Sequence, residues 1–340
     1  MPLSPVTPLG AFTPSTIAAI NAALAQAGLA ATTGNVYFVD PVNGLDTNDG
    51  TNPAVTSGGH GPVKTLAAGY AFLRSGYNDV LVLIGNGAAT GSARIAMFTW
   101  AKNAAHLIGV CAPSAISQRA RIANATTAGL TMTANFFTVS GNGCLFQNLS
   151  WFHGAGAGQT GIAADICMTV SGQRNAFINC DIEGMGDATS AADAGSRNLK
   201  VTAGENYFGH CNIGLDTVTR TNANASVEFS AGCARNYFEN CTFPFLSGDG
   251  ATLGILGTGA ACMDRFQLFR GCVFINAIKS TAVAMTVLAS LTSAASGGML
   301  AYHDCLLIGI TKFGDALALG QSYSYGAVNS TANSLAANPA

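Results

Sequence analysis

Five cysteines recur at nearly equal intervals in the second half of the sequence: Cys180, Cys211, Cys241, Cys272 and Cys305. A nucleophilic cysteine needs a nearby base and an electropositive, partly exposed setting, and five equivalent residues cannot all have one. Disulfides between neighbours are disfavoured too. Side chains of stacked strands lie ~4.8 Å apart, whereas the Cβ atoms of a disulfide lie ~3.8 Å apart. We therefore expect these thiols to fill a narrow apolar slot as small hydrophobic side chains.

Paired carboxylates are the second candidate for chemistry, because glycoside hydrolysis needs two of them roughly 5 to 9.5 Å apart on one surface. The best pair is Asp181 and Glu183, which we expect to point outward from one strand, with Asp187 and Asp216 as possible neighbours. The positions that follow in the next coils hold no carboxylates, and no cluster of Lys or Arg accompanies the pair. Asp181, Glu183 and Asp216 are therefore the candidates only if the protein is an enzyme.

Metal and cofactor sites are not indicated by the sequence. The stretch GLDTNDG supplies Asp46, Asn48 and Asp49, but Gly50 comes one residue too early for an EF-hand loop and no Glu follows at the required distance. Turns closed by Asp and Asn side chains explain these residues equally well. The five histidines show neither metal-ligand spacing nor a triad partner. We expect no metal and no cofactor.

The cysteines belong to a repeat whose period is about 31 residues. An aromatic residue stands three positions before each cysteine, and one further copy precedes them with Leu149 in place of the thiol. The aromatic positions are Phe146, Phe177, Phe208, Phe238, Phe269 and Tyr302, at intervals of 30 to 33 residues. A regular period of this length is typical of solenoid proteins.

The repeat unit has the pattern of short strands. Apolar residues alternate over four to six positions, β-branched and aromatic types are frequent, and Gly, Asn and Ser separate the runs. This pattern predicts an all-β, single-stranded parallel β-helix in which the aromatic and the cysteine point inward. The residue before each cysteine would occupy a sharp left-handed bend. These residues are Asn148, Asn179, His210, Asn240, Gly271 and Asp304.

The pattern divides the chain into four segments. Residues 1–34 form an extension with a short helix between Thr13 and Gly28, which we expect to pack against another subunit or a larger assembly. Residues 35–79 form a cap with a helix from Gly61 to Gly76. Residues 80–320 form seven or eight coils, and residues 321–340 form an extended arm.

The start of the repeat resembles a known group of proteins. VDPVNGLDTNDG, then PVKTLAAGYAFL, an apolar strand and repeated F-x-N-C-x-[IF] coils are similar to the opening of right-handed parallel β-helix proteins of the pectate-lyase-like kind. Many of these are encoded by bacteriophages and prophages. The resemblance covers roughly residues 35–310. It implies a right-handed solenoid with a helical cap, but no particular activity, because the fold carries lyases, hydrolases, tail spikes and inert structural parts.

The amino-acid composition argues against two classes of function, nucleic-acid binding and membrane insertion. Only 9% of residues are charged, against roughly 25% in an average soluble domain, and the net charge is −2. No basic block suggests a nucleic-acid partner, and no apolar run approaches the ~18 residues of a membrane span. The N-terminus lacks the pattern of a secretory signal. We therefore expect a protein made in a host cytoplasm that neither binds nucleic acid nor inserts into a membrane.

The main functional hypothesis is a non-enzymatic virion structural protein, most simply a phage capsid decoration protein. It would form homotrimers and bind the major capsid protein or another virion protein. Low charge, small-residue surfaces, the Ala-rich N-terminal helix and the C-terminal arm favour it. The alternative is a phage tail spike that binds or cleaves a host surface glycan. A free polysaccharide lyase is a third class, which the missing basic site disfavours.

Overall fold

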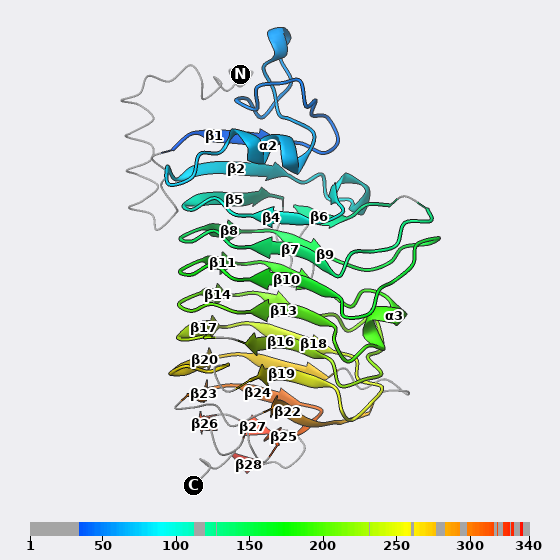
Figure 1. Ribbon diagram of the computed structural model, residues 1–340, viewed down its shortest axis with the longest axis vertical. Helices are drawn as coiled ribbons and strands as arrows, with labels where there is room; N and C mark the ends of the chain where they lie inside the picture. The colour runs from blue at the N-terminus through cyan, green and yellow to red at the C-terminus, as the bar shows by residue number, and fades with distance from the viewer. Residues whose placement is uncertain are drawn as a thin grey trace, which may run out of the picture.

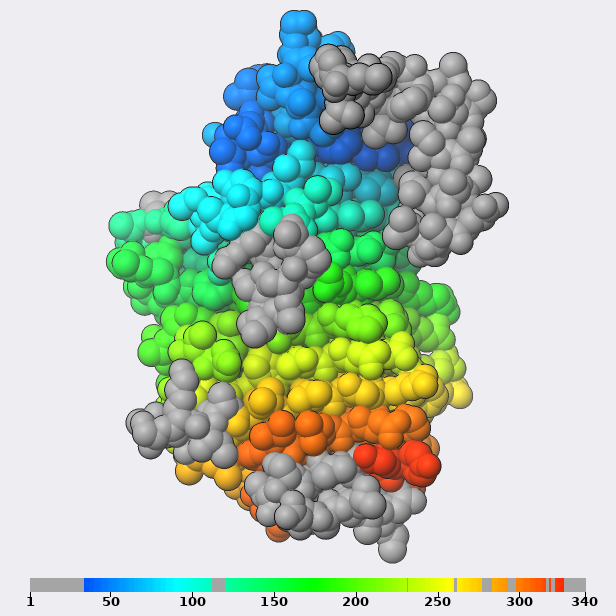
Figure 2. Space-filling model, turned by 180° about the vertical axis from the view of Figure 1, so that it is seen from behind, coloured from blue at the N-terminus to red at the C-terminus, as the bar shows by residue number. Residues whose placement is uncertain are grey.

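The chain is a parallel β-helix in which three sheets run along one axis (Figure 1). Seen from behind, its coils form successive layers from the N-terminal to the C-terminal end (Figure 2). The computed structural model describes residues 34–111, 120–126, 128–230, 232–259, 262–276, 283–292, 298–315, 318, 322–326, 328–329 and 334–335. The all-β solenoid that the sequence predicts is confirmed. The predicted helix within residues 1–34 lies outside the described residues.

Sheet A contains the aromatic repeat. Within the described residues it has ten parallel strands, each paired with the strand one coil earlier. Its strands are β1 (Val36–Val39), β2 (Asp79–Ile84), β5 (Ala105–Val110), β8 (Leu145–Gln147), β11 (Ala176–Ile178), β14 (Tyr207–Gly209), β17 (Asn236–Glu239), β20 (Phe266–Arg270), β23 (Met299–His303) and β26 (Ser322–Tyr325).

Sheet B follows the bend after sheet A in each coil. In the described chain its strands are β3 (Ala93–Ile95), β6 (Arg121–Asn124), β9 (Ser150–Phe152), β12 (Asp181–Glu183), β15 (Asn212–Ile213), β18 (Thr242–Phe245), β21 (Val273–Asn276), β24 (Leu306–Ile308), β27 (Val328–Asn329) and β28 (Ser334–Leu335). β28 pairs antiparallel with β27, whereas the other pairs are parallel.

Sheet C completes the coil after a longer connection. Its eight described strands are β4 (Phe98–Trp100), β7 (Asn135–Val139), β10 (Ile166–Val170), β13 (Arg197–Val201), β16 (Ala225–Ser230), β19 (Leu253–Thr258), β22 (Met285–Leu291) and β25 (Ile310–Gly314). Sheet C therefore has fewer described strands than sheets A and B, which have ten each. The connections from sheet B to sheet C project as loops from one side of the solenoid (Figure 1).

Helical segments are few and short in the described residues. They are η2 (Ser57–Gly59), α2 (Leu66–Phe72), η3 (Ala89–Gly91) and α3 (Ala188–Ala191). α2 is shorter than the helix expected from Gly61 to Gly76. It begins only after Thr65, whose hydroxyl accepts a hydrogen bond from the Ala68 N–H, because Val63 first forms a bridge with Val39 of sheet A.

Two predicted segment boundaries differ from the structure. β1 lies within the predicted cap, yet it pairs with β2 in register and is the first strand of sheet A. β26 lies within the predicted C-terminal arm, yet it pairs with β23 as the last strand of that sheet. The solenoid therefore extends past residue 320, because Ser322–Tyr325 satisfies the backbone groups of the preceding coil.

The aromatic column of sheet A is the centre of the core. Phe146, Phe177, Phe208, Phe238 and Phe269 stack in sequence with ring centroids 4.6 to 4.8 Å apart and interplanar angles of 12° or less. Tyr302 continues the column at 5.6 Å. These rings are buried, as the repeat predicts. Their spacing equals that of hydrogen-bonded strands, so the rings follow the backbone register directly.

The five repeating cysteines form a second buried column beside the first. Each thiol lies 3.3 to 3.5 Å from the carbonyl oxygen of a ladder phenylalanine in the preceding coil. Burial raises the pKa values of Cys211 and Cys241 well above the ordinary thiol value. These two thiols therefore stay protonated and donate weak hydrogen bonds.

The bend between sheets A and B is also as expected. The six bend residues have φ values between 52° and 60°. The side chain of Asn179 donates to that of Asn148 at 2.8 Å. At Gly271 a Cβ would lie 2.4 Å from Oδ1 of Asn240, so the glycine leaves space for the amide of the preceding coil.

A buried amide ladder at the other end of sheet A was missed in the sequence. Asn175, Asn206, Asn236 and Gln267 each stand two residues before a ladder phenylalanine and are at most 1% exposed. The side-chain oxygen of each accepts the backbone N–H of the preceding coil, at 2.8 to 3.3 Å. The ladder thus satisfies backbone donors at a corner where no strand pairing is available.

Replacing Cys241 by serine should lower the free energy of unfolding by about 1–3 kcal/mol, since the change buries a hydroxyl in an apolar slot. Chemical denaturation of the purified protein measures this loss. Cys111→Ser, at a half-buried position outside the column, should change stability by no more than about 0.5 kcal/mol. Equal effects from both variants would contradict the packing role of the column.

Replacing Asn206 by alanine should cost on the order of 3 kcal/mol, because the N–H of Asn175 loses its acceptor inside the core. Thermal unfolding followed by circular dichroism reports the change. The matched control is Asn86→Ala, because Asn86 is exposed and water replaces its hydrogen bond to the Ala88 N–H. A stability loss no larger than that of the control would show that the ladder is dispensable.

Candidate functional site

The carboxylates proposed from the sequence are not exposed as a pair. Asp181 and Glu183 flank the inward-facing Ile182 on β12, but they are only 2% and 3% exposed. Both residues are therefore covered, although their positions on the strand alternate with that of the inward-facing Ile182. Alternation along a strand identifies side chains outside the core, but does not show whether other parts of the chain cover them. Asp216 is half-buried in the connection after β15.

Asp187, the fourth carboxylate considered, has a structural contact. It precedes α3, and one carboxylate oxygen accepts the N–H groups of Thr189 and Ser190 at 2.9 and 3.1 Å. Its other oxygen accepts the Ala155 N–H of the preceding coil at 3.2 Å. Asp187 therefore fastens two neighbouring connections to each other.

The GLDTNDG loop also uses its oxygens within the chain. Asp46 accepts the N–H groups of Lys64 and Thr65 at 2.9 and 2.8 Å. Asp49 lies 2.5 Å from His60. Burial raises the pKa of Asp49, but hydrogen bonds from Thr51, His60 and Gly61 outweigh it and lower the value to about 2. In the described part of the chain, no group of three His, Cys, Asp or Glu side chains could hold a metal ion.

His153 has a buried acidic partner that the sequence did not indicate. Its Nδ1 lies 2.6 Å from Oδ1 of Asp165, and both side chains are fully buried. The imidazole stacks on Phe136 at 4.6 Å. Burial raises the pKa of Asp165. The two residues begin and end the connection from β9 to β10, so their contact closes the base of this loop.

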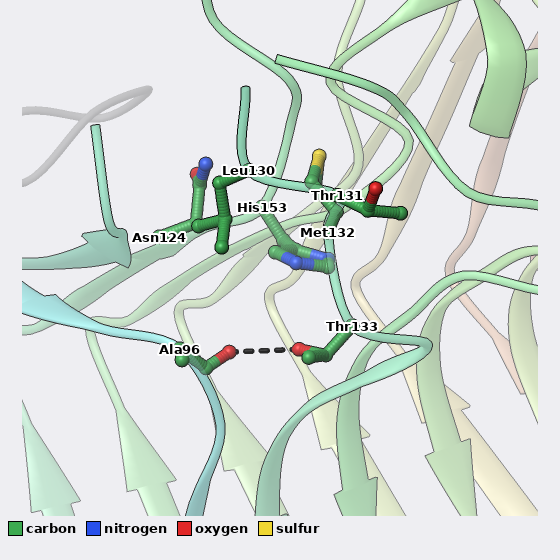
Figure 3. Close-up of a pocket in the computed structure, with 7 residues that line it drawn as sticks. All are labelled: Ala96, Asn124, Leu130, Thr131, Met132, Thr133 and His153. Carbon is green, nitrogen blue, oxygen red and sulfur yellow. Dashed lines mark hydrogen bonds between the residues drawn. The ribbon is translucent and has the colours of Figure 1, made fainter. Parts of the chain in front are cut away.

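A small cavity lies beside His153 (Figure 3). Its volume is about 20 Å³, enough for roughly one water molecule. On one side Thr133 donates to the Ala96 carbonyl at 2.7 Å. The lining residues are Ala96, Asn124, Leu130, Thr131, Met132, Thr133 and His153. The cavity is too small for a sugar ring, so the His153–Asp165 pair has no access to a polysaccharide.

Sheet C carries a charged cluster that joins two coils. Glu228 on β16 lies 2.7 Å from Nε of Arg197 and 3.0 Å from Nζ of Lys200, both on β13. Thr258 of the next coil donates to the same carboxylate at 3.1 Å. Burial raises the pKa of Glu228, but the bonds from Lys200 and Arg197 outweigh burial and hold it below its ordinary value. Glu228 is thus ionised and fully paired, which suits a structural tie better than a general base.

Arg220 is a second buried cation near this cluster. Its guanidinium donates to the Asn224 side chain and carbonyl, the Ser226 hydroxyl and the Leu253 carbonyl, at 2.6 to 3.0 Å. Burial lowers its pKa. The contacts connect the loop before β16 to β19 of the next coil. Neutral acceptors therefore hold this charge in place of a carboxylate.

The outer face of sheet A carries an apolar column that we call the apolar stripe. Its members pair in register on seven successive strands. They are Leu145, Ala176, Tyr207, Tyr237, Leu268, Ala301 and Tyr323. The first six are half-buried and Tyr323 is exposed. Six of the seven directly precede a ladder aromatic that the sequence analysis names, so the repeat contained the signal, but the outward direction of these positions was not used.

Tyr207 is held flat against this face. Its hydroxyl donates to Glu239 at 2.8 Å, and a Cβ on Gly209 would lie 2.7 Å from the ring and the hydroxyl. Tyr237 stacks beside it at 5.8 Å. Arg270 lies 3.5 Å from Glu239. The Tyr207 ring therefore lies over Gly209, in the space that the side chain of any larger residue at position 209 would occupy.

Ion pairs border the apolar stripe on its other side. Arg174 contacts Glu205 at 2.6 Å, and Arg235 contacts the same carboxylate from the following coil. Each of these residues stands two positions before a member of the stripe. The stripe thus runs between two charged borders, with Arg174, Glu205 and Arg235 on one side and Glu239 and Arg270 on the other.

Comparisons with known proteins establish the fold. No family model and no curated protein matches the chain. A mutant pectin methylesterase in complex with a hexasaccharide superimposes with a TM-score of 0.56 at 15% identity, covering 91% of this chain and 92% of that one. A pectin methylesterase from Aspergillus niger gives 0.57 at 14% identity, with the same coverage. Pectate lyase Pel9A gives 0.50 at 14%, covering 90% and 82%.

These neighbours are parallel β-helices of the pectate-lyase-like kind, and this chain shares their fold. At such low identity the likeness extends to the fold alone. No helix in the described residues has the length and apolar character that a membrane crossing requires.

Replacing Glu228 by glutamine should make the protein less sensitive to acid. The folded-state pKa of Glu228 lies below its ordinary value of 4.5, so its ion pairs contribute stability that is fully present above about pH 4.5. That contribution is lost as the pH falls through the folded-state value. Melting temperatures of both proteins between pH 7 and pH 2 measure the difference. The gap between them should be widest at neutral pH and should close on acidification, and a constant gap would contradict the pairing.

Proposed function

We propose that the protein is a non-enzymatic structural component of a virus particle, a capsid decoration protein that forms oligomers on the particle surface. Its partners are further copies of the chain, as a homotrimer, and the major capsid protein or another virion protein. The assignment to a phage rests on the sequence resemblance of residues 35–310 to β-helix proteins that phages encode.

The observation that carries the proposal is the distribution of exposed large apolar side chains. In the described residues they occur on both ends of the solenoid and are absent between residues 111 and 282. They are Val36, Val42, Leu45, Val55, Tyr77, Met97 and Val110 at one end, and Val283, Met299, Leu306, Tyr323 and Tyr325 at the other. Exposed apolar side chains mark contact with other proteins where they form a contiguous patch. This distribution supports the proposal that both ends of the solenoid contact neighbouring proteins in the particle.

The side chains that could catalyse polysaccharide cleavage are covered or paired within the chain, which supports the same structural role. Asp181 and Glu183 are covered, and Glu228 is neutralised by Arg197 and Lys200. Nine of the ten cysteines are buried and the tenth, Cys111, is half-buried. Acid–base catalysis needs a carboxyl group that reaches the substrate and exchanges a proton with it, and these residues are instead committed to packing and pairing.

The proposal predicts a fixed and high ratio of this protein to the major shell protein in purified particles. Quantitative gel densitometry of the particles measures the ratio. Incubation with capsular polysaccharide or lipopolysaccharide should leave chain length unchanged, as followed by size-exclusion chromatography. A low ratio, together with released oligosaccharide, would instead identify a tail spike.

A variant tests the apolar ends directly. The triple change Val42→Ser, Leu45→Ser and Val55→Ser removes exposed apolar side chains from the N-terminal end and should reduce incorporation into particles. Val218→Ser, at a half-buried position in a central connection, is the matched control and should not. Full incorporation of the triple variant would contradict the proposed contact.

A further inference from the structure

We propose that the contact between His153 and Asp165 is a proton-dependent latch, which holds the connection from β9 to β10 closed in acid and releases it as the pH rises. The two residues lie at opposite ends of that connection, and both side chains are fully buried. Neither residue belongs to a ladder of the solenoid. The inference goes beyond the virion role and does not rest on it.

The hydrogen bonding of the His153 ring depends on Asp165 alone. Its Nδ1 lies 2.6 Å from Oδ1 of Asp165, and its Nε2 is buried without a hydrogen-bond partner in the part of the chain that the structure describes. One face of the ring stacks on Phe136. The small cavity of Figure 3 adjoins the ring, so packing is incomplete there. Without the Asp165 contact, the ring would be held mainly by stacking.

The short distance between the two side chains fixes how many protons the pair can hold. A nitrogen and an oxygen 2.6 Å apart are hydrogen-bonded, so at least one proton lies between them. With that proton alone, as imidazole and carboxylate, the pair has one net negative charge. A second proton leaves the pair with no net charge. Because a buried net charge is costly, the closed connection favours the pair with two protons.

Acidic neighbours favour the second proton as well. Burial raises the pKa of Asp165, the contact with His153 lowers it, and the nearby charge of Asp187 raises it again, so that the pKa lies above its ordinary value of 3.8. Glu183 on β12 is a further acidic neighbour, and its carbonyl accepts the His153 backbone N–H at 2.8 Å. A second proton on the pair therefore relieves repulsion between carboxylates.

The other ionisable groups beside the pair do not offset this negative charge. Burial raises the pKa of Cys167 on β10 well above the ordinary thiol value, and the charges of Asp165 and Glu183 add to the effect, so the thiol is neutral. Arg197 donates its backbone N–H to the Asp165 carbonyl at 2.6 Å, but its guanidinium pairs with Glu228. Among the described residues, no lysine or arginine forms an ion pair with Asp165.

The connection ends in a strained turn that needs such contacts. Ala164 has a φ of 52°, in the left-handed region that disfavours residues with a Cβ. Its N–H donates to Asp193 in the next connection at 2.7 Å, and the Asp165 N–H donates to the Ser196 hydroxyl at 3.1 Å. Strained turns persist only where surrounding contacts hold them. Loss of the buried contact therefore favours opening of this connection.

The direction of the pH dependence follows from the proton count. In the open connection water solvates both side chains, so the pair gives up its second proton more readily than in the closed one. The closed form therefore binds more protons. Its stability is present in acid and is lost as the pH rises through the value at which the closed pair releases its proton. The raised pKa of Asp165 acts with the same sign. One proton changes the opening equilibrium by at most about tenfold per pH unit.

Thiol labelling of the full-length protein tests the latch. Cys167 is fully buried two residues after Asp165 and reports opening of the connection, whereas the buried ladder thiol of Cys241 reports global unfolding. The protein is treated with N-ethylmaleimide between about pH 5 and pH 9, and mass spectrometry of its peptides gives both labelling rates. Their ratio cancels the pH dependence of the reagent, because both thiols react as thiolates. The ratio should rise with pH.

Three variants separate the latch from other causes. Asp165→Asn keeps an acceptor for Nδ1–H but cannot exchange a proton, so it should abolish the rise. Asp187→Asn removes a neighbouring negative charge and should move the rise to lower pH. Asp193→Ala is the control, because it removes a contact that does not involve the pair. It should increase the ratio at every pH and leave the rise with pH unchanged.

Four results would overturn the proposal. They are a ratio that is constant or falls as the pH rises, a rise that persists in Asp165→Asn, a rise that Asp187→Asn leaves at the same pH, and a rise that is lost in Asp193→Ala. If Asp165→Asn does not fold, fast labelling of Cys241 will show it, and His153→Gln takes its place with the same two outcomes. The purified protein is measured, so a failure of the virion role would leave these results unchanged.

Discussion

The parallel hydrogen-bonded register between coils is the constraint on which the rest of the structure depends. It holds each residue beside its equivalent about one period later, as Phe177 stands between Phe146 and Phe208. Two side chains at a strand spacing of ~4.8 Å must have compatible shapes and polarity. Aromatic rings therefore stack on rings, thiols on thiols and amides on amides. A ladder of like residues is the form in which a solenoid satisfies this requirement at every level.

The same register limits where chemistry is possible. A catalytic group needs an environment unlike that of its neighbours, and a ladder gives each member the same one. The unusual charged contacts accordingly lie outside the ladders, with His153 and Asp165 at the base of a connection and Glu228 between two strands of sheet C. Each of these contacts is buried within the chain. Side chains in the ladders thus pack in regular columns, whereas the contacts that occur only once in the chain lie outside these columns.

The sequence predicts the parts of the structure that repeat and misses those that do not. The period identified the aromatic and cysteine columns and the left-handed bend at Asn240, because each copy supplies independent evidence for the same position. It did not show that Asp181 is covered, because burial on the outer face depends on other parts of the chain. Arg197 and Glu228 are 31 residues apart, and only the register between coils makes them neighbours. The contact of His153 with Asp165 depends on a loop conformation that no pattern encodes.

The outer surface of sheet A shows that a ladder can also create a surface with one consistent chemical character. Because inward and outward positions alternate, the register that aligns the phenylalanines also aligns Tyr207 with Tyr237 and Leu268 on the opposite face. An outward apolar column is not needed for the core, and it exposes apolar area that water disfavours. Six of its seven members are nevertheless half-buried, so the stacking of equivalent side chains in successive coils covers much of this apolar area.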